Sequence, residues 1–285
     1  MRSDRKQIHV CVFVVLVGLF TPALRAQQRP LRTPDATILP PGTLRIEAGL
    51  DFLQGVDFPL SGLSGDLTGV GVLRLRMAVG RRVEVQLEGI AQNVLQVNRQ
   101  VPAPVRPQLT GGDSTHDVGD FSLWTKIRMV AENRHPALAF RFGFEMPNSN
   151  QARGIGTNTT NVYASLIAEK HLGRLDLFGQ SGLGILQSPS AQFSQNDVWI
   201  YGGAFRLPVL KRLALAGEIA GRHSTRKLTP ALFGTESRGQ GRLGLVWTFG
   251  GFQWDAAAVA GIYRNDPTTG FTFGVSRDVR LFHWK

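Results

Sequence analysis

The sequence predicts an all-β fold: an antiparallel up-and-down transmembrane β-barrel of about 12 strands. Strand-like segments with one apolar and one charged face, connections that alternate between short and long, and aromatic residues near strand ends predict it. In ALAFRFGFEM, Phe140 and Phe142 lie on one parity, whereas Arg141 and Glu145 lie on the other. A soluble sandwich would bury these aromatics, and a membrane barrel would turn them toward lipid and the charges toward its lumen.

The first 26 residues have the pattern of a secretory signal peptide, with a charged start, the apolar run IHVCVFVVLVGLF and a small residue before Gln27. The apolar run is shorter than the roughly 20 residues of a spanning helix, and no later segment offers such a run either. We therefore expect a signal peptide at 1–26, a Pro-rich periplasmic lead at 27–43 and an outer-membrane β-barrel at 44–285.

Removal of residues 1–26 takes away four basic residues and one acidic residue, which leaves 28 basic and 20 acidic ones in the mature chain. The basic residues are scattered singly among acidic ones and form no recognition motif, so nucleic acid is not an expected partner. Cys11 leaves with the signal, which excludes disulfide and thiol chemistry from the mature chain.

Twelve segments have the length and alternation of spanning strands. They are 44–54, 70–79, 83–96, 118–131, 137–146, 161–170, 174–185, 197–207, 212–222, 238–249, 252–263 and 270–282. The segments at 161–170 and 212–222 are also compatible with helices, and we predict strands there because the barrel needs an even count.

The connections between these segments alternate strictly. Short connections lie at 80–82, 132–136, 171–174, 208–211 and 250–251. Long connections lie at 55–69, 97–117, 147–160, 186–196, 223–237 and 264–269. Outer-membrane barrels have tight periplasmic turns and longer external loops, whereas a Greek-key sandwich has no reason to alternate in this way.

Pairing across the turn at 80–82 gives faces of consistent chemistry: if Val79 and Val83 close it, Arg76 faces Gln86 and Arg74 faces Glu88 on one face. The same sorting gives a set of candidate lumen-lining residues with charges of both signs. They are Arg74, Arg76, Glu84, Glu88, Lys126, Arg128, Arg141, Glu145, Asp176, Glu218, Arg242, Asp255, Asp278 and Arg280.

Aromatic residues are expected in girdles where the strands meet the two membrane interfaces. Trp247, Phe249, Phe252 and Trp254 surround one short turn, and Trp199, Tyr201, Phe271 and Phe273 are expected near long-loop ends. Ordinary core aromatics are the alternative explanation. Arg277 is an exception to the pattern, because it falls on the apolar parity of the last strand.

Three stretches resemble the outer-membrane β-barrel family associated with the MetA-pathway of phenol degradation: TPDATILPPGTLRIEAGLDF (33–52), VGDFSLWTKIRM (118–129) and FGFEMPNSNQARGIGTNTTNV (142–162). The chain departs from the family at Pro147-Asn148-Ser149, where the family has Pro-Thr-Gly. The resemblance implies an exported barrel associated with small-molecule transport, and it carries over no catalytic residue.

No catalytic, cofactor or metal site is expected. His223 and Ser224 are adjacent, so an extended strand points them to opposite faces and they cannot form a nucleophile–base pair. The other histidines of the mature chain, His116, His135, His171 and His283, fall in loops, turns or the tail. Asp113, Asp117 and Asp120 have a composition compatible with calcium but lack an EF-hand pattern, which favours a solvated loop.

About 12 strands should enclose a constricted lumen. We therefore predict a channel or transporter for small solutes, including aromatic or partly apolar ones. We do not expect it to be an enzyme. The sequence leaves open whether the lead plugs the lumen. The expected partners are outer-membrane lipid, the barrel-assembly machinery during insertion and the small-molecule solute. A lipid-modifying barrel enzyme and a structural barrel without transport are the alternatives.

Overall fold

The computed structural model describes residues 28–109, 112–189, 194–226 and 232–282, so the predicted signal peptide lies outside the described residues. Its strands are β1 (Thr43–Phe58), β2 (Leu63–Ala78), β3 (Val83–Gln100), β4 (Ser114–Asp117), β5 (Ser122–Val130), β6 (Ala137–Glu145), β7 (Asn161–Leu172), β8 (Leu175–Gln187), β9 (Gln195–Leu210), β10 (Leu213–Ser224), β11 (Arg238–Phe249), β12 (Phe252–Gly261) and β13 (Thr269–Arg280). The one helical element in these residues is the short 3-10 helix η1 (Gln151–Arg153). No helix among the described residues has the length and hydropathy needed to cross a membrane.

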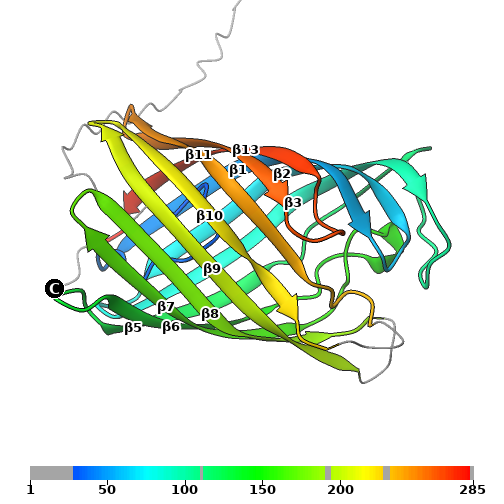
Figure 1. Ribbon diagram of the computed structural model, residues 1–285, viewed down its shortest axis with the longest axis horizontal. Coiled ribbons are helices and arrows are strands. Elements are labelled where there is room, and N and C mark those ends of the chain that lie inside the picture. Colours follow the sequence, from blue (N-terminus) through cyan, green and yellow to red (C-terminus); the bar gives the residue numbers. More distant parts are fainter. Residues whose placement is uncertain (1–27, 110–111, 190–193, 227–231, 283–285) are drawn as a thin grey trace, which may run out of the picture.

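The strands form a closed 12-stranded antiparallel barrel (Figure 1). Each strand pairs with its neighbour in sequence, and β1 pairs with β13, which closes the sheet. The short strand β4 and the strand β5 occupy a single strand position, because both pair with β3. The predicted fold class is therefore confirmed, and the segment predicted as one strand at 118–131 begins later, at Ser122.

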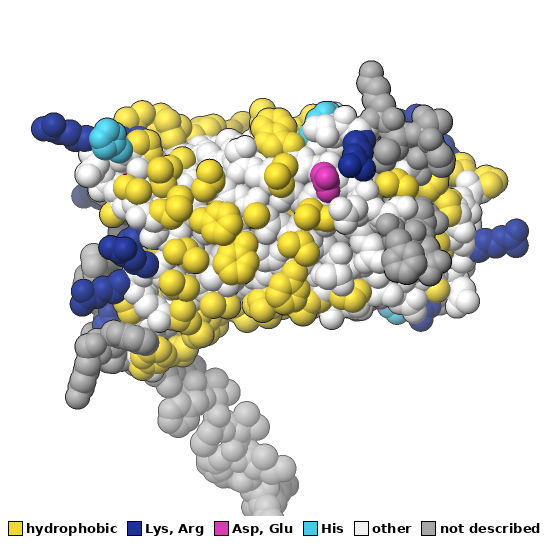
Figure 2. Space-filling view, turned by 90° about the horizontal axis from the view of Figure 1, so that it is seen from below, with side chains coloured by type: hydrophobic (Ala, Val, Ile, Leu, Met, Phe, Trp, Pro, Cys, Tyr) yellow, Lys and Arg dark blue, Asp and Glu magenta, His cyan; other side chains and the backbone are white. Residues whose placement is uncertain are grey.

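Side-chain alternation separates an apolar outer wall from a polar interior. In β6, Leu138, Phe142 and Phe144 are exposed on the outside, whereas Ala139 and Arg141 are buried on the inside. Figure 2 shows apolar side chains across one face of the outer wall, with charged side chains near its two ends. Bilayer lipid is the solvent that suits such a wall, because an apolar band facing outward is the arrangement of membrane barrels.

The predicted hairpin register is confirmed. Val79 N–H donates to Val83 O, and Arg74 pairs with Glu88 and Arg76 with Gln86 across β2 and β3. The two segments with helix-like patterns are both strands, β7 and β10.

The predicted long loop at 55–69 is wrong. β1 and β2 continue almost to each other and leave only residues 59–62 between them. Gly55 and Gly71 have positive φ within the strands, where the pairing register of β1 and β2 shifts. Glycine is the residue that such β-bulges require, so these glycines mark bulges and not a loop.

The aromatic residues only partly follow the predicted girdles. Phe273 packs with Trp247 and Trp254, at ring-centroid distances of 6.4 Å and 6.1 Å, and so belongs to the short-turn cluster instead of the opposite end. Arg277, the exception on the apolar parity, lies over the ring of Phe252 at 4.7 Å. This cation–π contact accounts for a charge on the outer wall near a strand end.

Candidate functional site

The lumen is occupied by residues 28–42, which we call the lead. This segment has no regular secondary structure and lies inside the barrel, as the blue chain in Figure 1 shows. It precedes β1, whose first residue, Thr43, pairs with Arg280 at the end of β13. The lead therefore occupies the lumen near the barrel end where the short turns lie.

Inward-facing carboxylates hold the backbone of the lead. The Glu218 carboxylate accepts hydrogen bonds from the N–H groups of Arg32 and Thr33 at 2.7–2.8 Å. Glu169 accepts from Ala36 N–H at 3.0 Å and from both the N–H and the hydroxyl of Thr37. Because an irregular segment cannot satisfy its own N–H groups, these carboxylates replace the partners that a sheet would supply.

Inward-facing cations bind the lead's oxygens. Lys126 Nζ donates to Thr37 O and to the Asp35 carboxylate, both at 2.6 Å, and Arg76 contacts the same carboxylate at 2.8 Å. Glu84 contacts Arg76 at 2.8 Å and Lys126 at 3.2 Å, which closes a network of two cations and two carboxylates. Burial by itself raises the pKa of the Asp35 carboxyl, but Arg76 and Lys126 outweigh it and hold that pKa below its usual value.

Arg29 anchors the start of the lead on the inner wall. Its guanidinium contacts Asp255 at 3.3 Å and donates to the Thr272 hydroxyl and to Phe273 O, both at 3.1 Å. The guanidinium lies against Gly49 and Gly274, where a β-carbon would collide with it. The apolar residues of the lead pack as well: Leu31 contacts a cluster that includes Phe178 and Val246, and Ile38 and Leu39 contact Ala78.

The predicted lumen-lining residues divide into three groups. Arg76, Glu84, Lys126, Glu218, Arg242 and Asp255 are buried and contact the lead directly. Arg74 also donates to Leu31 O of the lead at 3.5 Å, and it meets Arg141 at the Glu88 carboxylate, at 3.0 Å and 2.5 Å. The remaining predicted residues have described contacts that do not involve the lead. Arg128 contacts Arg81 O, Glu145 contacts Asn161, Asp176 contacts Arg206, and Asp278 contacts Arg45. Arg280 is exposed at the end of β13.

Charged residues of the lead and of the inner wall were missed, among them Arg29, Asp35, Glu47, Asp51 and Glu169. Glu47 and Asp51 share a parity with Arg45 in β1, so the alternation in LRIEAGLD was the available signal. Glu169 falls in a segment that is apolar on both parities in its middle. Asp35 lies outside any strand, where alternation gives no information.

A second part of the inner wall carries polar atoms without a protein partner among the described residues. Glu47 Oε1, Asp51 Oδ1, Asp255 Oδ1 and Ser276 Oγ are buried and make no hydrogen bond. Their strands are neighbours, since Glu47 pairs with Ser276 across β1 and β13, and β12 pairs with β13. Buried oxygens without a protein partner are costly unless water or a solute satisfies them.

Outside the lumen, a polar cluster lies where β9, β10 and β11 end at the long loops. As predicted, His223 and Ser224 point to opposite sides: His223 is exposed, whereas Ser224 accepts a hydrogen bond from the buried Asn196. A different serine approaches the histidine, because Ser237 Oγ is 3.5 Å from His223 Nδ1. Tyr263 is nearer, with its hydroxyl 3.1 Å from the same nitrogen.

The acidic loop residues considered for calcium serve the loop backbone instead. Asp117 accepts from Asn150 N–H at 2.6 Å, and Asp120 accepts from Asn148 and Ser149 N–H at 3.0 Å and 2.7 Å. Among the residues that the structure describes, no group of three His, Cys, Asp or Glu side chains is arranged to hold a metal ion.

Comparison with known proteins supports the barrel fold. No protein-family model matches the chain, and no curated protein sequence matches it. Among solved structures, it is similar to an outer membrane channel from Pseudomonas putida F1, with 16% sequence identity and a TM-score of 0.59 over 86% of this chain and 98% of that one. The translocator domain of the autotransporter NalP from Neisseria meningitidis is also similar, with 15% identity and a TM-score of 0.49 over 82% of this chain and 88% of that one.

One prediction from sequence must be corrected. LpxR from Salmonella typhimurium is among the similar barrels, with 7% identity and a TM-score of 0.41 over 82% of this chain and 99% of that one. The prediction that the protein is not an enzyme is wrong as an exclusion, because one fold can carry an active site or a channel. Ser237 also lies near His223, so the orientation of Ser224 does not by itself exclude a serine–histidine pair.

Proposed function

We propose that the protein is an outer-membrane channel that passes small solutes through the lumen, past the lead and the inner wall formed by β1, β12 and β13 to which Arg29 of the lead is bound. The single observation that carries this proposal is the set of buried, unpartnered oxygens of Glu47, Asp51, Asp255 and Ser276 on that wall. A barrel serving only as structure gains nothing from such atoms, because each one opposes burial unless water or solute reaches it.

The lead makes this channel narrow. Glu218, Glu169 and Glu84 fix three successive parts of its backbone, at Arg32–Thr33, Ala36–Thr37 and Leu39. The similarity to an outer membrane channel supports the general class. The resemblance to the phenol-degradation family makes small aromatic or partly apolar solutes the first class to test, with export to an outer membrane as the setting.

Single-channel recording in planar bilayers tests the proposal. We expect the full mature chain to give a small, resolved conductance. The double variant Glu169→Gln/Glu218→Gln weakens charge-assisted bonds that contribute about 1.5–3 kcal/mol each, so the lead leaves the lumen more often and open probability rises at least tenfold. Glu145→Gln is the control, because Glu145 bonds to Asn161 and not to the lead.

Folded, inserted protein that conducts in neither form would overturn the proposal and favour a barrel without transport. Heat-modifiable migration on a gel verifies that each variant is folded before it is recorded. Influx of a small phenol into vesicles that contain the protein then tests the solute class separately from conductance.

A further inference from the structure

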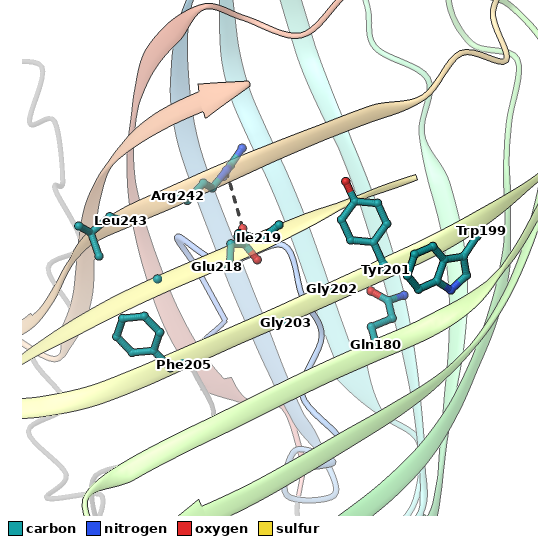
Figure 3. Close-up of a pocket in the computed structure, with 11 residues that line it drawn as sticks. Gln180, Trp199, Tyr201, Gly202, Gly203, Phe205, Glu218, Ile219, Arg242 and Leu243 are labelled. Carbon is teal, nitrogen blue, oxygen red and sulfur yellow. Dashed lines mark ion pairs between the residues drawn. The ribbon is translucent and has the colours of Figure 1, made fainter. Parts of the chain in front are cut away.

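The outer wall carries a groove that the channel proposal does not use. A cavity of about 620 Å³ lies over β8 to β11 and is lined largely by apolar surface, with Trp199, Tyr201 and Phe205 of β9 along it (Figure 3). These side chains have the outward parity of β9, as does the exposed Ile219 in β10. The aromatic side of the groove therefore faces the bilayer, and Glu218 and Arg242, whose side chains contact the lead in the lumen, also line the cavity.

Glycine forms the floor of this groove. Gly203 pairs with Gly179 of β8 and with Ile219 of β10, and a β-carbon at either glycine would meet no atom within 4 Å. Aromatic rings close the two ends: Phe205 lies over Gly217, and Tyr201 lies over Gly221 and Gly239. Tyr201 and Phe205 are four residues apart, so the groove extends roughly 13 Å along the strand, which suits part of an extended hydrocarbon chain.

The end of the groove nearest the long loops is polar. The Tyr201 hydroxyl donates to the Tyr263 hydroxyl at 3.4 Å, and the Tyr263 hydroxyl lies 3.1 Å from His223 Nδ1, over which its ring is stacked. With Nδ1 accepting from Tyr263, the neutral imidazole carries its proton on Nε2. No described residue bonds to that N–H, which leaves a donor directed away from the cluster.

Charge at this end favours an anion. Arg264 follows Tyr263 directly, is exposed and makes no ion pair with any residue that the structure describes. Arg226 is near but is paired with Asp197 at 3.9 Å. An apolar groove about one chain wide that ends in cationic and N–H donors matches a phosphate-bearing lipid.

We propose that the groove between Phe205 and Tyr201 binds one acyl chain of a phosphate-bearing membrane lipid, whose phosphate lies against His223 and Arg264. The site is on the outer wall, and it shares Glu218 and Arg242 with the inner surface that holds the lead. A lipid held there would cover the part of the wall where glycine leaves the backbone of β8 and β9 without side-chain cover.

Native mass spectrometry of the full mature protein, released from detergent containing phosphatidylglycerol, tests this site. We expect the wild type to retain one phosphatidylglycerol molecule under conditions that remove the others. Gly203→Leu fills the groove from a position where a β-carbon meets no atom within 4 Å, and should lower the retained fraction at least fivefold. Ala164→Leu adds the same bulk to the exposed outer wall of β7 and should leave retention unchanged.

The headgroup contact is tested with the pair His223→Gln/Arg264→Gln. This variant should lower retention of phosphatidylglycerol about fivefold and leave retention of diacylglycerol with the same chains unchanged. Equal retention by wild type and Gly203→Leu, or an equal loss in Ala164→Leu, would overturn the groove as a site. Equal losses of both lipids in the headgroup variant would overturn phosphate recognition. Channel conductance of Gly203→Leu should match the wild type, which separates this proposal from the proposed function.

Discussion

At the scale of single residues, the interior of this barrel shows how buried charge is tolerated. Asp35 contacts both Arg76 and Lys126, and Glu84 contacts the same two cations. Each charge therefore has at least two opposite partners within 3.2 Å. Removing one member of such a network is more damaging than its net contribution suggests, because the charges left behind stay buried.

Asp35→Asn is expected to release the lead. Arg76 and Lys126 would then lose one of the two carboxylates that they both contact, at a cost of about 3–5 kcal/mol for a broken buried pair. Hydrogen exchange of residues 28–42 should become much faster, while that of the strands stays the same. Asp113→Asn, at an exposed loop position, is the control. Slow exchange of the lead in Asp35→Asn would show that this network does not hold it.

Lowering the pH should also release the lead, because it protonates Asp35. Its pKa in the seated lead is below the ordinary value of 3.8, so its stabilising contribution is complete above that pH and is lost as the pH falls through the lowered value. The groups that face it are Arg76 of β2, Glu84 of β3, Lys126 of β5 and, more distantly, Glu169 of β7. In the wild type, protonation of Asp35 should release the lead from the lumen below about pH 4. Asp35→Asn should lack this acid-induced release.

At the scale of elements, strands were predictable and the lead was not. The parity of a strand such as β6 follows from its own residues, because two faces meet two different solvents. The place of the lead depends on pairing with residues far along the chain, such as Arg29 with Asp255 and Thr33 with Glu218. A single sequence shows which charges point inward but not which of them meet a segment outside the sheet. The prediction therefore left open whether the lumen is plugged.

A disulfide between the lead and β9 tests that placement. A β-carbon at Gly202 would lie 3.4 Å from the Thr33 β-carbon, close to the roughly 3.5–4.5 Å found in disulfides. The double variant Thr33→Cys/Gly202→Cys should therefore cross-link when oxidised and show low, steady conductance. Reduction should restore the openings of the wild type.

The pair Thr33→Cys/Gly173→Cys is the matched control, because Gly173 lies in the turn between β7 and β8 and has no neighbour within 4 Å of a β-carbon there. Equal cross-linking in both pairs would mean that the lead samples many positions and is not seated on β9.

At the scale of the whole molecule, the fold inverts the usual distribution of polarity. Arg45, Arg76 and Lys126 are among the largest fully buried side chains, whereas Leu183 and Leu243 are more than half exposed. In water such a surface would promote association, because large exposed apolar patches are unfavourable there. The arrangement is stable only when hydrocarbon covers the wall and the lead satisfies the charges within.

The free-energy cost of placing a charge on the outer wall tests whether hydrocarbon covers that wall. Phe142→Arg places a guanidinium near the middle of β6 on the exposed outer face. A cation at the bilayer midplane costs about 2–4 kcal/mol, so the ratio of folded to unfolded protein in lipid should fall at least tenfold. Urea titrations monitored by heat-modifiable migration measure this ratio. Val101→Arg, which is similarly exposed but follows the end of β3, should change the folded fraction little. Equal effects of the two substitutions would mean that the β6 wall does not face hydrocarbon, since in water an exposed arginine costs the same at either position.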